Sequence, residues 1–153
     1  MKLKNIVFVV ENIEVSKSFY KELFGLQVIH DFGENVILME GLVLQEKKLW
    51  ETAIAKMTNL GGHNACLYFE ENNMADFIDK LNNCNYQIEY VTPCMERDQG
   101  QRVVRIYDPD RHVIEVSESV EFVARRLLRE GLTVEEVVEK TRMPYSYVEM
   151  MNQ

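Results

Sequence analysis

In residues 1–46 the spacing of apolar positions changes from that of a strand to that of a helix and back. Residues 3–10 are rich in β-branched and aromatic side chains, which predicts a strand. The next apolar positions recur at helical spacing, and they are Val15, Phe19, Tyr20, Leu23 and Phe24. Asn12 can cap this helix and Gly25 can end it. Three short strands are predicted to follow, at 27–30, 35–39 and 42–45.

The same order of elements recurs in the second half of the chain. Residues 64–69 predict a strand, Asn72 or Asn73 can cap a helix, and three further strands fit at 86–91, 102–107 and 113–116. The helix carries apolar residues at Met74, Phe77, Ile78 and Leu81. Two tandem βαβββ modules are therefore predicted, residues 1–46 and 62–117, within an α+β domain over 1–117. A linker at 47–61 joins them, and the second is longer because of a polar loop at 92–101.

Residues 118–153 change to a purely helical pattern. Thr133 and Glu136 form a capping box, Gly131 ends the preceding helix, and a last helix is predicted to begin near Pro144. The segment resembles a short helix-turn-helix module, but its last helix carries Glu149 and no Lys or Arg. We therefore expect a helical extension that does not bind DNA. Its expected buried residues are Val120, Val123, Leu127 and Tyr147.

The composition narrows the functional classes. The chain has 153 residues, with 25 acidic and 17 basic side chains and a net charge of −8, which argues against nucleic-acid binding. The three cysteines Cys66, Cys84 and Cys94 lack a CxxC pair, which predicts buried or half-buried reduced thiols. No segment has the length of a membrane span or a signal peptide. We expect a cytoplasmic protein with no membrane partner.

Two segments carry a resemblance to a known family. They are Ser16–Gly25, after the first strand, and Arg102–Val116, which contains Asp-Pro-Asp-x-x-x-x-Glu. With the tandem βαβββ pattern, they resemble the vicinal oxygen chelate superfamily, which includes glyoxalase I, extradiol dioxygenases, fosfomycin-modifying enzymes and bleomycin-resistance proteins. The resemblance implies eight strands around a U-shaped cleft. It also implies a homodimer, because a second copy of the chain usually completes that cleft.

The resemblance places the family's metal ligands at the first and last strand of each module. Carried over to this chain, these positions are Asn5, Gln45, Asn64 and Glu115. Three of the four are neutral amides, which are poor ligands for zinc, nickel or iron(II). We therefore expect no metal cofactor, with a divalent metal as the alternative.

None of the three histidines falls on a predicted ligand position. In a regular strand His63 points away from the face that Asn64 occupies, and His112 lies three residues from Glu115, which is again an opposite-face spacing. His30 also lies outside the four predicted ligand positions. We expect all three to be surface or turn imidazoles.

Strand alternation predicts which residues line the cleft. The core-facing sets are Ile6, Phe8 and Val10 in the first module and Ala65, Leu67 and Phe69 in the second. The opposite face gives the candidate ligand-binding residues Asn5, Gln45, Asn64, Tyr68, Arg105, Tyr107 and Glu115. Arg105 is either an anchor for an anion or a partner that neutralises Glu115. Glu115 is either a general base or a structural carboxylate.

Two other residues have both a functional and a structural interpretation. Cys66 lies on the cleft face, but no histidine can be placed beside it, so we expect a packed thiol rather than a nucleophile. Trp50 could stack on a planar ligand, but we favour a buried anchor for the linker.

Three functional readings remain. The first is a protein that binds a small organic or anionic molecule without metal catalysis, comparable to bleomycin-resistance proteins. The second is a metal-dependent lyase or dioxygenase-type enzyme of the same superfamily. The third is a regulatory or interaction protein that acts through its helical extension. We favour the first, because the apolar groove carries a few orienting polar groups and the ligand positions are amides.

Overall fold

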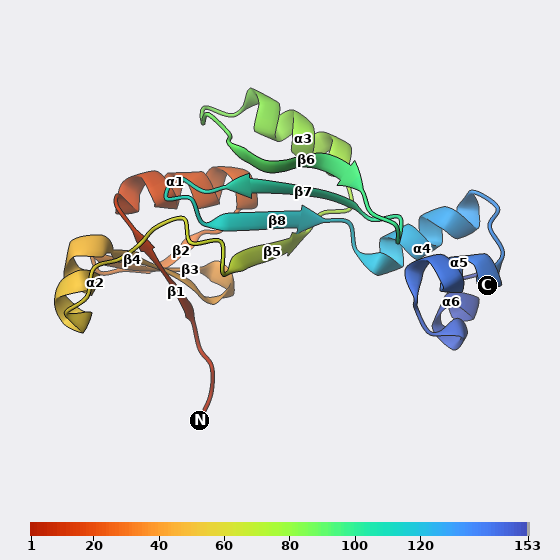
Figure 1. Cartoon of the computed structure of the whole chain (residues 1–153), viewed down its shortest axis with the longest axis horizontal. Coiled ribbons are helices and arrows are strands. Elements are labelled where there is room, and N and C mark those ends of the chain that lie inside the picture. Colours follow the sequence, from red (N-terminus) through yellow and green to blue (C-terminus); the bar gives the residue numbers. More distant parts are fainter. Residues whose placement is uncertain (153) are drawn as a thin grey trace. The chain divides into compact units, whose positions relative to one another are not determined.

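Two four-stranded sheets and six α-helices make up the computed structural model, which describes residues 1–152 (Figure 1). The predicted α+β class is confirmed. The chain divides into two compact units, which are described separately below. The first unit contains Met1–Ala65, Cys84–Gln87 and Tyr107–Val113, and the second contains Cys66–Asn83, Ile88–Ile106 and the chain from Ile114 onward.

The sheet of the first unit has the strand order β1-β4-β3-β2. Its strands are β1 (Ile6–Val10), β2 (Val28–Asp31), β3 (Asn35–Leu38) and β4 (Leu42–Glu46). β1 runs parallel to β4, and the other pairs are antiparallel. Phe8, Val36 and Leu44 occupy one buried row of this sheet, as alternation predicts. Ile6 is an exception, because it is the first residue of an edge strand and is 53% exposed.

Helix α1 (Ile13–Phe24) packs against the central strand β4. The Asn12 side chain accepts a hydrogen bond from the Val15 amide at 3.1 Å, and Gly25 ends the helix in the left-handed conformation. Phe19 and Tyr20 of this helix are buried. Both predicted helix ends are therefore confirmed.

The linker between the modules contains a helix that the sequence analysis missed. Helix α2 (Lys47–Ile54) begins directly after β4, and the Glu46 side chain caps it by accepting from the Leu49 amide. Trp50 lies on this helix and is half-buried. A short 3-10 turn, η1 (Met39–Gly41), connects β3 to β4.

The sheet of the second unit has the strand order β5-β8-β7-β6. Its strands are β5 (Cys66–Glu70), β6 (Tyr90–Glu96), β7 (Arg102–Tyr107) and β8 (Val113–Ser117). Helix α3 (Met74–Asn83) follows β5 and buries Met74, Phe77 and Leu81. Asn73 caps it through the Asp76 amide, whereas Asn72 instead accepts hydrogen bonds from Ser119.

The position of β6 corrects the prediction of a strand at 86–91 followed by a polar loop at 92–101. The strand begins at Tyr90 and continues through Pro93. Proline cannot donate to a ladder, but β6 is the edge strand of its sheet, where one side needs no donor. The pairing with β7 also shifts register between Thr92 and Met95, around this proline.

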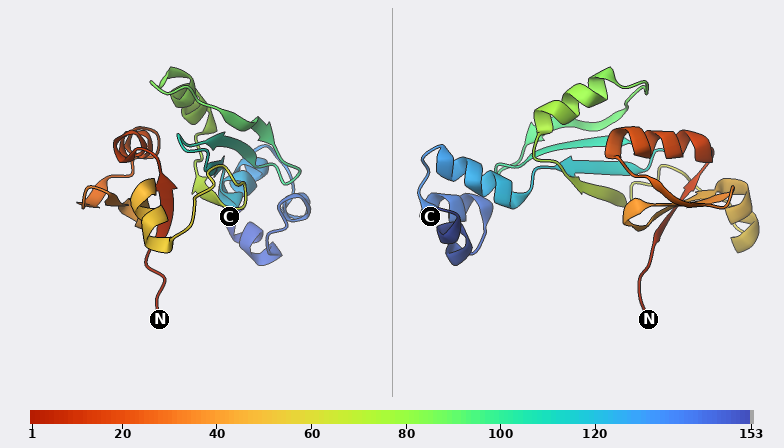
Figure 2. Two further views of the ribbon diagram at one scale, coloured as in Figure 1. Left: turned by 60° about the vertical axis from the view of Figure 1, so that its left-hand side comes forward. Right: turned by 180° about the vertical axis from the view of Figure 1, so that it is seen from behind.

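The C-terminal extension folds into three helices with a core of their own (Figures 1 and 2). They are α4 (Val120–Arg129), α5 (Val134–Thr141) and α6 (Tyr145–Met151). The capping box at Thr133 and Glu136 is confirmed. Val123 and Leu127 are buried as predicted, but Tyr147 is exposed and its neighbour Val148 is buried instead. The inward face of α6 is thus one residue away from the predicted one.

The cysteines correct a second expectation about burial. None of the three forms a disulfide bond within residues 1–152, but Cys66 and Cys94 are exposed and Cys84 is half-buried. Cys66 lies on the outward face of β5, and Cys94 lies on the edge strand β6. In residues 1–152 no helix combines the length and the apolar composition that a membrane crossing requires.

Candidate functional site

Two neighbouring strands of the second sheet bring Arg105 and Glu115 together. The Arg105 Nε donates to a Glu115 carboxylate oxygen at 2.6 Å, and its Nη1 donates to the Thr92 hydroxyl at 3.3 Å. Both side chains are mostly shielded from solvent, with 25% and 14% of their surfaces exposed. The predicted pairing of a basic and an acidic residue is therefore present in the structure.

A second arginine contacts the same carboxylate. The Arg97 Nη2 donates to the other Glu115 oxygen at 2.9 Å, so one carboxylate lies between two guanidinium groups. Two positive charges facing one negative charge leave this cluster with a net positive charge. Arg105 donates through Nε and Nη1 and Arg97 through Nη2, so each guanidinium keeps further N–H groups for a ligand.

Arg97 was not among the predicted site residues. It follows β6 directly and lies in the segment that the sequence analysis assigned to a polar loop. Its backbone amide donates to the Gln101 carbonyl oxygen, which fixes the turn between β6 and β7. A prediction of β6 with the correct end would have placed Arg97 beside β7.

Tyr68 lies on β5, the strand adjacent to β8. Partial burial, followed by the charges of Glu70 and Glu115, raises the pKa of its phenol, and a hydrogen bond with Ser117 acts in the opposite direction. Its hydroxyl donates to Glu70 at 3.4 Å. The structure therefore brings together three predicted residues on this sheet, Tyr68, Arg105 and Glu115.

The predicted residues of the first module do not converge. Gln45 pairs with Val9 in the β1–β4 ladder, whereas Asn5 precedes Ile6 at the start of β1. Four residues of strand between Asn5 and Val9 correspond to about 13 Å. The Gln45 amide is also satisfied within its own sheet, because it accepts from Asn35 at 2.8 Å and donates to the Glu34 carbonyl oxygen at 3.0 Å.

These contacts do not fit the divalent metal that the superfamily implies. Glu115 is paired with two arginines, and Gln45 is hydrogen-bonded within its own sheet. Asn5 lies before β1, far along the chain direction of that strand from Val9, the residue that Gln45 pairs with. In the part of the chain that the structure describes, no three His, Cys, Asp or Glu side chains gather in a group that could hold a metal ion.

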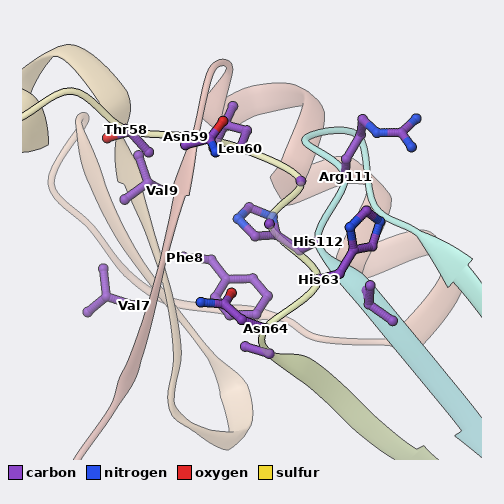
Figure 3. Close-up of a pocket in the computed structure, with 14 residues that line it drawn as sticks. Val7, Phe8, Val9, Thr58, Asn59, Leu60, His63, Asn64, Arg111 and His112 are labelled. Carbon is purple, nitrogen blue, oxygen red and sulfur yellow. The ribbon is translucent and has the colours of Figure 1, made fainter.

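Asn64 and His63 line a cavity of about 200 Å³ in the first unit (Figure 3). The expectation that they face opposite ways assumes a regular strand and does not apply here, because β5 begins only at Cys66. His63 also has a positive φ of 57°, which turns the chain at this point. Arg111 and His112, from the turn between β7 and β8, line the same cavity.

Tyr107 is held by a residue of this turn and by one of the segment before β5. Its hydroxyl is hydrogen-bonded to the His63 Nε2 atom, and the Arg111 guanidinium carbon lies 4.2 Å from the centre of its ring. The Arg111 side chain passes beside Gly61, where a Cβ atom would lie 3.4 Å from the Arg111 Cβ. Tyr107 therefore has a structural role in fixing the turn.

The two aspartates of the Asp-Pro-Asp stretch are both buried. Asp108 accepts from the Tyr20 hydroxyl at 2.7 Å, and Asp110 accepts from the Glu11 amide at 2.9 Å and the Ser16 hydroxyl at 3.3 Å. Burial is the main cause that raises the pKa of Asp110, and the neighbouring Asp108 charge adds to it. These carboxylates fasten the start and the middle of α1.

The comparison with protein families decides which family this architecture represents. The model of the glyoxalase-like domain matches residues 3–121. The chain belongs to the glyoxalase-like family. It is thereby a member of the vicinal oxygen chelate superfamily, as the sequence motifs indicate. The match ends just inside α4, so most of the helical extension lies beyond it.

Solved structures share the fold of this chain. A protein of unknown function from Agrobacterium tumefaciens shares 36% identity, with a TM-score of 0.63 over 78% of this chain and 94% of the other. A glyoxalase-related enzyme from Fulvimarina pelagi has 18% identity and a TM-score of 0.66, with 77% and 88% covered. A lactoylglutathione lyase from A. tumefaciens has 19% identity and a TM-score of 0.60, with 77% and 93% covered. The last two likenesses concern the fold alone.

A comparison with the curated proteins finds no match. The function of this glyoxalase-like chain must therefore be argued from its own side chains.

Proposed function

We propose that this glyoxalase-like protein binds a small organic anion at Arg97 and Arg105 and does so without a metal ion. The observation that carries the proposal is the arrangement of two guanidinium groups around the single carboxylate of Glu115, at 2.9 and 2.6 Å. The excess positive charge attracts an anion. The Glu115 carboxylate holds both planar groups in place before the ligand arrives.

The surroundings of the two arginines suit a carboxylate or phosphate ligand. Each guanidinium offers paired N–H groups in a plane, which match two oxygens of an anion. The groups are partly shielded from solvent, so their attraction for an anion is less screened than at a fully exposed site. Tyr68 on β5, the strand next to that of Glu115, offers an aromatic ring and a hydroxyl to the organic part of the ligand.

Calorimetric titration with succinate and phenyl phosphate tests the proposal, with succinamide and phenol as uncharged counterparts. We expect at least one anion to bind and its counterpart not to bind. Arg105→Gln and Arg97→Gln should each weaken binding by about tenfold or more, because each removes a charge-assisted hydrogen bond. Arg125→Gln is the matched control, since Arg125 is an exposed arginine on α4.

Chelator treatment distinguishes this proposal from a metal-dependent site. The affinity should be the same before and after exhaustive treatment with EDTA. Equal binding by Arg105→Gln, Arg97→Gln and the unmodified protein would overturn the proposal, and so would binding that returns only when a divalent metal is added.

The proposal includes a homodimer. Both edge strands of the first sheet expose apolar side chains, including Ile6 on β1 and Val28 and Ile29 on β2. Exposed apolar edge strands are surfaces on which a second chain can pair. Light scattering should give twice the 18.0 kDa mass of one chain. A monomeric mass at micromolar concentration would contradict the dimer but not the anion site.

A further inference from the structure

The His112 ring is fixed by contacts on its edge and on its face. Its Nδ1 atom lies 2.8 Å from Asp108 Oδ2, and its ring stacks on Phe8 with 4.3 Å between the ring centres. Phe8 is a buried residue of β1. The side chain lies in a turn, as the sequence predicts, and these contacts give it one orientation.

Asp108 determines which nitrogen of His112 carries the hydrogen. Its two oxygens accept from four donors: the Tyr20 hydroxyl, the backbone amides of Asp110 and His112, and the His112 Nδ1. A carboxylate in this position only accepts, so the hydrogen of a neutral imidazole lies on Nδ1. The lone pair is then on Nε2. A carboxylate that orients an imidazole in this way also stabilises the imidazolium that forms when Nε2 takes up a proton.

His112 lines the cavity of about 200 Å³ in the first unit (Figure 3). At about 30 Å³ for each water, this is room for about six waters or for a small organic molecule. Val9, Leu60 and Val113 give the cavity apolar walls, and Asn64 adds an amide. Thr58 contributes a buried hydroxyl oxygen that has no hydrogen-bond partner within residues 1–152.

We propose that this cavity binds a small monocarboxylate with an apolar body, and that His112 Nε2 takes up a proton from water as the anion binds. An O–H bond of a hydronium ion breaks and an Nε2–H bond forms, which gives an imidazolium beside the bound carboxylate. The apolar walls receive the body of the ligand, and Asn64 and Thr58 offer hydrogen bonds to its polar end.

This site is independent of the anion site at Arg97 and Arg105, because all residues that line the cavity belong to the first unit. The titratable and charged groups around His112 are Asp108 and Asp110 on its own turn, Arg111 beside it, Tyr20 on α1 and His63 in the segment before β5. Because binding takes up a proton at His112, the affinity for the carboxylate should fall as the pH rises.

Nitrogen NMR of the histidine side chains in the full-length protein tests the proposal, with benzoate as the probe. On saturation with benzoate near neutral pH, the His112 Nε2 signal should move to the position of a protonated nitrogen. Benzamide, which has the same ring but no negative charge, should leave it unchanged. His30→Asn serves as the control variant, because His30 is an exposed residue of β2.

The decisive variant is His112→Asn, because an asparagine amide can still donate to Asp108 but has no counterpart of Nε2. It should fold with an unchanged far-ultraviolet circular dichroism spectrum and bind benzoate about tenfold more weakly or worse. Equal affinity in His112→Asn, or saturation without a change at the His112 nitrogens, would overturn the proposal. Loss of benzoate binding in Arg105→Gln with an unchanged His112 signal would assign the probe to the anion site instead.

Discussion

The Tyr20 hydroxyl donates a hydrogen bond of 2.7 Å to the buried carboxylate of Asp108, which lies 88 positions later in the chain. Two residues further on, Asp110 accepts from Ser16, one turn before Tyr20 on the same helix. The Asp-Pro-Asp stretch is the most specific sequence sign of the family in this chain. Its carboxylates bind α1 to the turn between β7 and β8, so here the motif stabilises the fold.

Tyr20→Phe should destabilise the protein near neutral pH and change its response to alkali. Loss of a hydrogen bond to a charged acceptor costs about 1.5 kcal/mol or more. Burial, and then the charge of Asp108, raises the pKa of Tyr20 well above its usual value. An unfolded tyrosine ionises near pH ~10, so above that pH the unfolded state loses this proton while the folded state keeps it. The contribution of Tyr20 to the free energy of unfolding is therefore fully present below pH ~10. Above that pH it decreases by up to about 1.4 kcal/mol per pH unit.

Urea unfolding at several pH values measures this effect. Between about pH 9 and about pH 11 the free energy of unfolding should fall more steeply for the unmodified protein than for Tyr20→Phe, which has no phenol to ionise. Tyr90→Phe, at an exposed tyrosine of β6, should retain the steep fall. If the free energy of unfolding decreases with pH at the same slope in the unmodified protein and in Tyr20→Phe, the ionisation of Tyr20 is not coupled to folding.

Asp108→Ala should be among the most destabilising single substitutions in the first unit. It leaves the Tyr20 hydroxyl, the His112 ring nitrogen and two backbone amides without their acceptor. We expect a loss of at least about 3 kcal/mol in the free energy of unfolding, measured by urea titration. Asp98→Ala removes an exposed carboxylate and should cost less than about 0.5 kcal/mol. Similar losses in the two variants would refute the anchoring role.

The elements that the sequence predicted well are those whose signals are local. Asn12 and Gly25 mark the ends of α1 from within one turn of it, and Thr133 and Glu136 mark the start of α5. Such signals act through hydrogen bonds between residues three or four apart, so they do not depend on the rest of the fold. The limits of β6 were predicted wrongly because Pro93 is acceptable only on an edge strand, and strand order is a long-range property.

The candidate site was predictable where residues lie on regular strands. Alternation placed Arg105 and Glu115 on one face of neighbouring strands, and the structure pairs them. It does not apply to His63 and His112, which lie in irregular segments. His63 and Arg111, the residue before His112, both have positive φ angles of 57° and 67°. A periodic pattern does not encode such turns, so the contact between His112 and Asp108 could not be read from spacing.

Glu118→Gln should loosen the junction between the second sheet and its helical extension. Glu118 is 1% exposed, accepts from the Arg102 amide at 2.9 Å, and lies 3.8 and 3.7 Å from the guanidinium groups of Arg102 and Arg126. Neutralising it leaves Arg126 partly buried without a counter-charge at this position. We expect a loss of about 2 kcal/mol or more by urea unfolding, with earlier amide hydrogen exchange in α4. Glu121→Gln, an exposed carboxylate in the first turn of α4, is the control, and an equal loss there would argue against the junction.

Alanine substitutions at two glycines separate backbone strain from crowding. Gly100 and Gly131 both have left-handed φ angles, of 86° and 97°, so alanine at either costs about 1 to 2 kcal/mol. At Gly100 the added Cβ would lie 3.1 Å from Val123 Cγ1 in the buried core of the extension, whereas at Gly131 nothing lies within 4 Å. Overpacking adds about 1 kcal/mol or more at Gly100 alone. Urea unfolding should therefore give a lower free energy of unfolding for Gly100→Ala than for Gly131→Ala. Equal values would mean that Val123 moves aside without a cost in free energy.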